Sequence, residues 1–347
     1  MRRRAALLSA GIAAGAVAAG VVTRAVVRHR LAPTAPIGDL PPEDLGMVAS
    51  FDGTELAVRA AGDVAAPVVI LSHGFSLDSS VWCELWPELA REFRVVVFDH
   101  RSHGASGTAA HGDLSLRAMG RDIAAVLAAT SSERPAVVIG HSMGAVAILA
   151  MAEQRPELFG RQIAGVVLIG AASSGLLRGA MGSVTELLRP RLGTFKTAAE
   201  RVDRLRRFAG SSPVDVSAVV ARVTQFGPDA PSHVVDHVVK LAEQTASEVW
   251  TDTLPELMEM DLRHAVPRIH VPALVIVGQH DRVTPPAAAV QLAGALPEGR
   301  LAVIAGAGHI PMLERPLDLD REMRPFVRDA LGGRPPERRR PRQEGAA

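Results

Sequence analysis

A serine between two glycines has the setting in this chain that most favours chemistry. Ser142 lies in the stretch Gly-His-Ser-Met-Gly at residues 140–144, after the apolar run 136–140 and before a run of small residues. A serine on a sharp turn between a strand and a helix needs glycine on either side, because side chains there would collide. Such a turn lifts the hydroxyl clear of the sheet, and the N-terminus of the next helix offers N–H groups to a developing oxyanion. We therefore predict that Ser142 is a nucleophile.

An aspartate and a histidine further along the chain have the settings of its partners. Asp281 follows the apolar run Ala273–Val277, and His309 follows the apolar run Leu301–Ile304 and a glycine-rich loop. An imidazole within reach of Ser142 can take the hydroxyl proton, and a carboxylate can hold that imidazole in the required tautomer. The order serine, aspartate, histidine, each after a strand, is the order expected for such a triad. His309 is thus the predicted general base and Asp281 the acid that orients it.

Other titratable side chains have settings that suit structural roles. Asp99 also follows an apolar run, but its position beside Arg101 and several glycines favours a network that stabilises a turn. The residues after the run 163–169 include no carboxylate, which leaves Asp281 as the acid. Among the 12 histidines, His141 adjoins the serine, but we expect its side chain to point away from the site.

Two backbone amides are predicted to form an oxyanion hole. The apolar run that ends at Ser72 is followed by His73, Gly74 and Phe75. The glycine permits close approach of the loop, so the Phe75 N–H can point into the site. The N–H of Met143, the residue after the nucleophile, is the predicted second donor. His73 itself is expected to bond to the backbone of its loop.

Composition limits the classes of partner and of site. Lys and Arg number 38 against 37 Asp and Glu, so no overall field favours nucleic acid. Aromatic residues make up only 3% of the chain, and there is no tyrosine to stack on bases. Cys83 is the only cysteine, so neither an internal disulfide nor a cysteine-based zinc site can form. It lies in an apolar stretch and is expected to be a buried hydrophobe; the residues do not specify an oligomeric state.

Short apolar runs that alternate with helical patterns must position these residues. The runs that predict strands lie at 67–72, 93–98, 136–140, 163–169, 273–277 and 301–304. This alternation indicates a parallel sheet covered on both faces, formed by residues 46–174 and 263–331. Residues 54–59 alternate between apolar and polar side chains and are predicted to pair at the edge of the sheet.

One interval between these parts contains no convincing strand. Residues 175–262 are expected to form a helical insertion, because about 90 residues are too many for a simple connection in a compact sheet. Amphipathic patterns within the interval predict helices at 183–188, 197–208, 214–223 and 232–243. Most of the apolar residues of the insertion are expected to pack a small core of its own.

The termini differ from the rest of the chain. Three arginines precede the uncharged run Ala5–Val22, which as a helix would reach about 27 Å, close to the roughly 30 Å of a bilayer core. Residues 1–30 are therefore predicted to be a membrane anchor or a secretory signal, which places the protein at the membrane or in the cell envelope. Residues 31–45 contain four prolines and are predicted to be a linker. The basic tail 332–347 is expected to be disordered.

Five motifs together resemble the α/β-hydrolase superfamily. They are His73-Gly74-Phe75, Asp99-x-Arg101-x-x-Gly104-x-Ser106, Gly140-His141-Ser142-Met143-Gly144, Gly278-x-x-Asp281 and Gly306-x-Gly308-His309. The resemblance spans about residues 47–331 in the family's order. It implies an α/β fold with a mostly parallel eight-stranded sheet, a helical cap between strands six and seven, and a cofactor-free Ser-His-Asp site that holds no metal. Members with an aspartate nucleophile, such as haloalkane dehalogenases and epoxide hydrolases, are disfavoured by the serine.

The resulting hypothesis is an esterase or lipase that cleaves an acyl or lipid-like carboxylic ester through an acyl-enzyme. An apolar cap suits such a substrate, because a charged one would need paired partners there. The same triad also serves amide, lactone and carbon–carbon bond hydrolases and cofactor-free haloperoxidases or perhydrolases. A membrane-tethered binding module is the non-enzymatic alternative. It is disfavoured because binding alone does not require a nucleophile, a base and an acid together.

Overall fold

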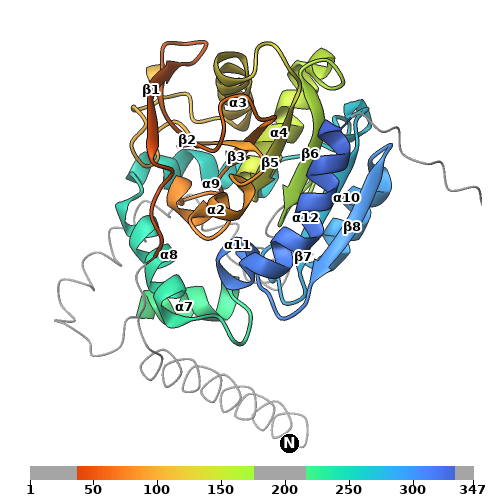
Figure 1. The fold of residues 1–347 in the computed structure, drawn as a ribbon. Helices are drawn as coiled ribbons and strands as arrows, with labels where there is room; N and C mark the ends of the chain where they lie inside the picture. Colours follow the sequence, from red (N-terminus) through yellow and green to blue (C-terminus); the bar gives the residue numbers. More distant parts are fainter. Residues whose placement is uncertain (1–36, 176–215, 333–347) are drawn as a thin grey trace, which may run out of the picture.

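The computed structural model describes residues 37–175 and 216–332 (Figure 1). Several predictions lie outside these residues: the anchor or signal, most of the linker, the cap helices expected at 183–188 and 197–208, and the basic tail. Within the two described ranges, no helix combines the length and the apolarity needed to cross a membrane.

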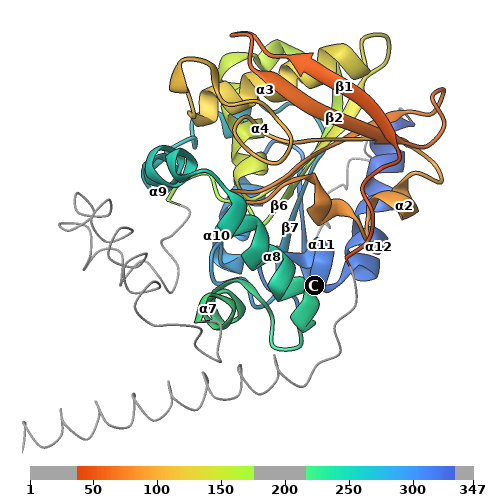
Figure 2. The same cartoon turned by 90° about the vertical axis from the view of Figure 1, so that its left-hand side faces the viewer.

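Eight strands form one twisted sheet at the centre of the molecule (Figure 1, Figure 2). The strands are β1 (Glu43–Ala49), β2 (Glu55–Ala61), β3 (Val68–Ser72), β4 (Arg94–Phe98), β5 (Ala136–His141), β6 (Ile163–Ile169), β7 (Ala273–Gly278) and β8 (Gly299–Ile304). Their order across the sheet is β1-β2-β4-β3-β5-β6-β7-β8. β2 is antiparallel to both of its neighbours, and every pair from β4 to β8 is parallel. The predicted mostly parallel, eight-stranded sheet is confirmed.

The antiparallel edge of the sheet differs from the prediction made for it. Residues 54–59 were expected at the edge, but β1 occupies the edge and pairs with β2. β1 begins at Glu43, within the range 31–45 that was assigned to the linker. Most of its residues are exposed, and a bulge interrupts it near Gly46. A strand with little buried surface has no apolar run or clean alternation by which the sequence could reveal it.

Helices cover both faces of the sheet. The longer helices of the core are α3 (Leu116–Thr130), α4 (Met143–Gln154), α10 (Pro286–Ala295) and α12 (Pro316–Leu331), and the short ones are α2 (Trp86–Leu89) and α11 (Pro311–Glu314). In β5, Ala136 and Val138 pack in one hydrophobic cluster with α3, α4 and α10. Val137 and Ile139, on the opposite face, pack in a second cluster with α2 and α12. Because both faces are buried, the central strands read as continuous apolar runs.

The cap follows β6 and precedes β7. Helices α7 (Val216–Gln225) and α8 (Ser232–Gln244) form close to the ranges predicted for them, and a π-helical turn (Val249–Thr253) leads into α9 (Leu254–Glu259). The sequence predicted that the insertion packs a small core of its own. The buried side chains of its described part instead join the two clusters of the main body. Phe226 and Val235 join the cluster on the α12 face, whereas Leu257 joins the cluster on the α4 face. This part of the cap is therefore packed onto the body of the molecule.

Candidate active site

Ser142 stands on the turn between β5 and α4 with a strained backbone. Its φ is 50° and its ψ is −115°, a conformation that L-residues rarely adopt. The two flanking positions require glycine for the steric reason that the sequence suggested, since a side chain at either one would clash with the backbone. A Cβ on Gly140 would lie 2.6 Å from the Ala145 nitrogen, and one on Gly144 would overlap the Ser72 carbonyl oxygen. The turn is thus closed tightly around the serine.

The structure brings Ser142, His309 and Asp281 into one hydrogen-bonded line. The Nε2 of His309 lies 3.0 Å from the Ser142 hydroxyl oxygen. The Nδ1 of His309 lies 2.8 Å from Oδ2 of Asp281. All three residues are buried. If Nδ1–H donates to the carboxylate, Nε2 is left free to accept the hydroxyl proton, which is the arrangement of a general base beside a nucleophile.

Asp281 is held by groups of its own loop as well as by the histidine. Its Oδ1 accepts hydrogen bonds from the backbone N–H groups of Val283 (2.9 Å) and Thr284 (2.8 Å), and its Oδ2 accepts one from the Thr284 hydroxyl at 2.7 Å. Burial raises the pKa of Asp281, but the charge of His309 and the hydrogen bonds from His309 and Thr284 outweigh it and lower the pKa. The carboxyl is therefore ionised and fixed in direction, as an orienting acid requires.

The amides of Phe75 and Met143 are the predicted donors of the oxyanion hole. Met143 is the first residue of α4, so its N–H has no acceptor within the helix. A Cβ on Gly74 would lie 3.2 Å from the Ser142 Cβ, which shows how closely the loop before Phe75 approaches the serine. Within the described residues, neither the Phe75 nor the Met143 amide donates to another protein group. The arrangement leaves both donors for a ligand, and their assignment stays a prediction.

His141 takes part in the site in a way that the sequence did not indicate. We expected its side chain to point away, but its ring lies beside that of His309, with centroids 4.9 Å apart. Its Nε2 donates to the backbone carbonyl of His309 at 2.9 Å. Burial and the neighbouring His309 lower the pKa of His141 to about 3, so the ring is neutral. Its place next to Ser142 was the one available signal for this supporting role.

Asp99 is not part of this line, although its partners differ from those expected. Its two carboxylate oxygens accept hydrogen bonds from the backbone N–H groups of Ser79 (2.7 Å) and Ala105 (2.8 Å). It therefore stabilises turns, as predicted, but it does so through amides and not through Arg101.

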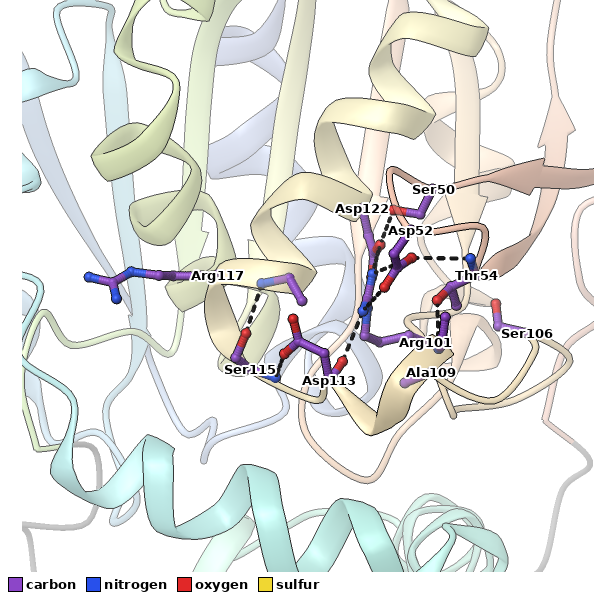
Figure 3. Close-up of polar contacts among 12 residues, drawn as sticks. Ser50, Asp52, Thr54, Arg101, Ser106, Ala109, Asp113, Ser115, Arg117 and Asp122 are labelled. Atoms are coloured by element: carbon purple, nitrogen blue, oxygen red, sulfur yellow. Dashed lines mark hydrogen bonds and ion pairs between the residues drawn. The ribbon is translucent and has the colours of Figure 1, made fainter.

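Arg101 is instead the centre of a buried network of its own (Figure 3). Its guanidinium makes two hydrogen bonds of 2.6 Å to Asp122 on α3. It also donates to Asp52 at 2.9 Å and to the carbonyl of Asp113 at 2.8 Å. Arg101 and Asp122 are both 0% exposed, so their charges depend on one another. The network joins the β1–β2 turn, α3 and the loop after β4.

The described residues contain no grouping of His, Cys, Asp or Glu side chains suited to hold a metal ion. Cys83 is buried, and its burial, together with Glu84, raises the pKa of the thiol to about 11. A protonated, buried thiol is inert, so Cys83 does not compete with Ser142 as a nucleophile.

Comparison with known proteins gives independent evidence on the family and the fold of this chain. Residues 67–316 match a family model described as alpha/beta hydrolase fold. A pimeloyl-[acyl-carrier protein] methyl ester esterase of Xanthomonas oryzae is 27% identical over 267 residues, which covers 75% of this chain and 95% of that protein. A Pseudomonas syringae protein assigned as a carbamate hydrolase is 26% identical over 263 residues, which covers 76% of this chain and 94% of that protein. The solved structure of a thermophilic esterase from Thermogutta terrifontis has a similar fold, with a TM-score of 0.66 and 24% identity over 83% of this chain and 99% of that one.

Proposed function

The chain belongs to the α/β-hydrolase fold family, and on that basis we propose that it is a serine hydrolase that cleaves a carboxylic ester through an acyl-enzyme. One observation carries this proposal. Ser142 lies on a strained strand-to-helix turn, and its hydroxyl oxygen is 3.0 Å from Nε2 of His309. The Nδ1 of His309 is 2.8 Å from Oδ2 of the ionised Asp281. A buried line of nucleophile, base and acid is what acyl transfer requires.

The chemistry follows from these positions. Ser142 attacks the carbonyl carbon of the ester while Nε2 of His309 takes the hydroxyl proton, and Asp281 stabilises the imidazolium that forms. His309 then gives this proton to the departing alcohol, which leaves the acyl group on the serine oxygen. A water molecule, deprotonated by His309, then attacks the acyl carbon. As the bond between that carbon and the serine oxygen breaks, His309 returns the proton to Ser142, which releases the acid and restores the free enzyme. The amides of Phe75 and Met143 hold the oxyanion in both halves of the reaction.

We propose that the acyl or alkyl part of the substrate contacts Phe75 of the oxyanion loop and Trp250 of the cap. The rings of Phe75 and the cap residue Trp250 contact each other edge to face, with centroids 4.8 Å apart. Trp250 keeps 39% of its surface exposed although it is large and apolar. Apolar contact there would stabilise a bound chain by up to about 0.8 kcal/mol per methylene, so activity should rise gradually with acyl length.

A second candidate is hydrolysis of a carbon–nitrogen acyl bond by the same triad. It is supported by the relative assigned as a carbamate hydrolase, whereas the methyl ester esterase supports an ester. The two reactions differ in the leaving group, which is an alcohol in an ester and an amine in a carbon–nitrogen acyl bond; the amine is the poorer leaving group and depends more strongly on the proton from His309. Matched ester, amide, carbamate and lactone substrates therefore distinguish them.

The N-terminal segment supports a proposal about location. Its uncharged run Ala5–Val22 follows three arginines, which suits a membrane anchor or an export signal. A catalytic domain tethered beside a bilayer would meet lipid-borne esters directly.

The central test is covalent labelling combined with two aspartate variants. We expect a fluorophosphonate to modify Ser142 alone, and Ser142→Ala to lower kcat by about 10⁴-fold or more. Asp281→Asn should lower kcat by roughly 10³- to 10⁴-fold with the fold intact, since the imidazole loses its tautomer and its charge partner. Asp99→Asn is the matched control, and should act on stability.

Mass spectrometry and steady-state kinetics on the ester panel provide the measurements. An adduct on another serine of a folded protein would contradict the assignment of the nucleophile. A large loss of kcat in Asp99→Asn with little loss in Asp281→Asn would reverse the roles of the two carboxylates.

A further inference from the structure

A buried carboxylate next to the predicted base has partners in two separate parts of the chain. Glu314 ends α11, and its side chain accepts hydrogen bonds from three backbone N–H groups. These belong to Gly308 (3.0 Å), Ile310 (3.2 Å) and Gly227 (2.7 Å). Within the described residues, no Lys, Arg or His side chain forms an ion pair with it. Burial raises the pKa of Glu314, whereas the hydrogen bonds from the three amides and the nearby His309 act to lower it.

The first two of these amides belong to the loop that carries His309. Gly308 and Ile310 are the residues on either side of the histidine, so the carboxylate holds the backbone at both of its ends. Fixing both flanking peptides restricts the rotation that would swing the imidazole away from Ser142.

The third amide belongs to the cap. Gly227 lies in the turn between α7 and α8, which both figures place at the same end of the molecule as α11 (Figure 1, Figure 2). The same turn contacts the histidine directly, since the His309 N–H donates to the carbonyl of Gln225 at 2.6 Å. A Cβ on Gly308 would lie 2.5 Å from that carbonyl oxygen, and a Cβ on Gly227 would overlap the carbonyl oxygen of Gly306. The turn and the histidine loop therefore meet backbone to backbone.

The loop of the acid contacts this turn as well. Arg282, which follows Asp281, donates from its guanidinium to the carbonyl of Val223 at 2.7 Å. The segment 223–227 of the cap is therefore attached to the loops of both the acid and the base.

From this juxtaposition we infer that Glu314 is a positioning residue, which locks the α7–α8 turn of the cap against the His309 loop and so keeps the imidazole in line with Ser142. The inference rests on the proposed serine-hydrolase function and adds a role for the cap, which then supports the base as well as covering the substrate. A carboxylate is needed because both of its oxygens face N–H donors. A glutamine would turn its own NH₂ group toward one of these donors and leave that amide without an acceptor.

Glu314→Gln tests this role, with the exposed Glu322→Gln on α12 as its matched control. We expect Glu314→Gln to lower kcat by roughly 10- to 100-fold with little change in KM, because a small displacement of a catalytic group costs rate more than binding. Hydrogen exchange should become faster in two peptides at once, one spanning residues 225–228 and one spanning 306–310. Glu322→Gln should change none of these quantities.

A second variant approaches the same contact from the cap. Gly227→Ala adds a methyl group where no space exists, far in sequence from the triad, and should also lower kcat more than it changes KM. Gly294→Ala in α10 is its control, since nothing lies within 4 Å of the added Cβ. All kinetics are measured well below the melting temperature of each variant.

The possible results separate the two proposals. A kcat within about twofold of wild type in a folded Glu314→Gln protein, or faster exchange in only one of the two segments, would overturn the role of Glu314. Wild-type protein that neither hydrolyses the ester panel nor reacts with a fluorophosphonate would overturn the proposed function. In that case the exchange experiment would still decide whether Glu314 holds the two segments together.

Discussion

Ser142 keeps a backbone conformation that the chain would avoid if stability alone mattered. A non-glycine residue at φ 50° and ψ −115° costs of order 1–3 kcal/mol, and the tight turn between β5 and α4 enforces it. The same turn sets the hydroxyl 3.0 Å from His309. Strain at this residue and its proposed chemistry therefore have one structural cause.

This strain predicts that activity and stability respond in opposite directions. Ser142→Gly should remove the hydroxyl and abolish the proposed esterase activity, yet raise the free energy of unfolding by roughly 1 kcal/mol, because glycine adopts positive φ without strain. Ser142→Ala removes the same hydroxyl but keeps the Cβ, so it should not be stabilised in this way. Denaturant titration of the three proteins checks the prediction. Equal stability of the Gly and Ala variants would show that the turn stores no strain at this residue.

At the scale of elements, two networks of charged side chains join segments that are far apart in the sequence. Arg101 links the β1–β2 turn to α3 through Asp52 and Asp122 (Figure 3). Glu153 near the end of α4 links that helix to Arg117 on α3 and to His264 before β7. The Arg101–Asp122 pair of the first network is completely buried, whereas the second network is near the surface, so their contributions to stability should differ.

Removing the arginine of the enclosed network should be severe. Arg101→Met leaves Asp122 buried without its partner, which typically costs about 3–5 kcal/mol of stability. Arg101→Lys should also destabilise the protein, because a single ammonium cannot make the paired hydrogen bonds of the guanidinium. Thermal melts measure both effects, and kcat at low temperature should stay near the wild-type value. A melting temperature unchanged in Arg101→Met would mean that the network contributes nothing to the fold.

The surface network predicts a pH dependence of stability. Hydrogen bonds from Arg117, and one from His264, lower the pKa of Glu153 to about 2, against 4.5 for a free glutamate. A carboxyl with a lowered pKa stabilises the fold above its unfolded pKa, and this contribution is lost as the pH falls through the folded pKa. The melting temperature of Glu153→Gln should therefore be lower than that of wild type at pH 7, and the difference should shrink between pH 4.5 and pH 3. Glu133→Gln, at an exposed position, is the control and should show no such trend.

At the scale of the whole molecule, the described domain begins with residues that are attached to it. Trp86 donates to the carbonyl of Asp39 at 2.8 Å, and Arg59 donates to the carbonyl of Pro41 at 2.7 Å. These contacts precede β1 and anchor the start of the edge strand. A truncation that spares the domain must therefore keep the chain from about Ile37 onward.

This boundary sharpens the test of the proposed anchor. We expect the full-length chain to fractionate with membranes, whereas a chain that begins at Ile37 should be soluble and fully active, because it keeps every contact of the described domain. N-terminal sequencing distinguishes an anchor, which keeps Met1, from a cleaved signal. Full-length, uncleaved protein found only in the soluble fraction would refute both proposals for the segment 1–30.

The sequence by itself was enough to predict the parallel sheet, the place of the cap and the three residues that the structure brings together. Ser142, Asp281 and His309 each follow an apolar run that forms a parallel strand, and the carboxyl ends of parallel strands meet at one edge of a sheet. Local patterns therefore predict that these three distant residues lie close together, because a parallel sheet brings the ends of its strands to the same edge. The strained serine was foreseeable for a similar reason, since its two glycines lie beside it in the chain.

Only the tertiary structure decided which distant groups support that site. The pairing of Arg101 with Asp122, the place of His141 beside His309, and the hold of Glu314 on Gly227 depend on how packed elements face one another. Many of these contacts involve backbone N–H and C=O groups, which every residue carries and which leave no mark in a sequence. The exposed strand β1 escaped prediction because it has almost no hydrophobic pattern to read. Patterns along a chain report what each segment buries, whereas the partner of each buried polar group is set by the packing of the whole.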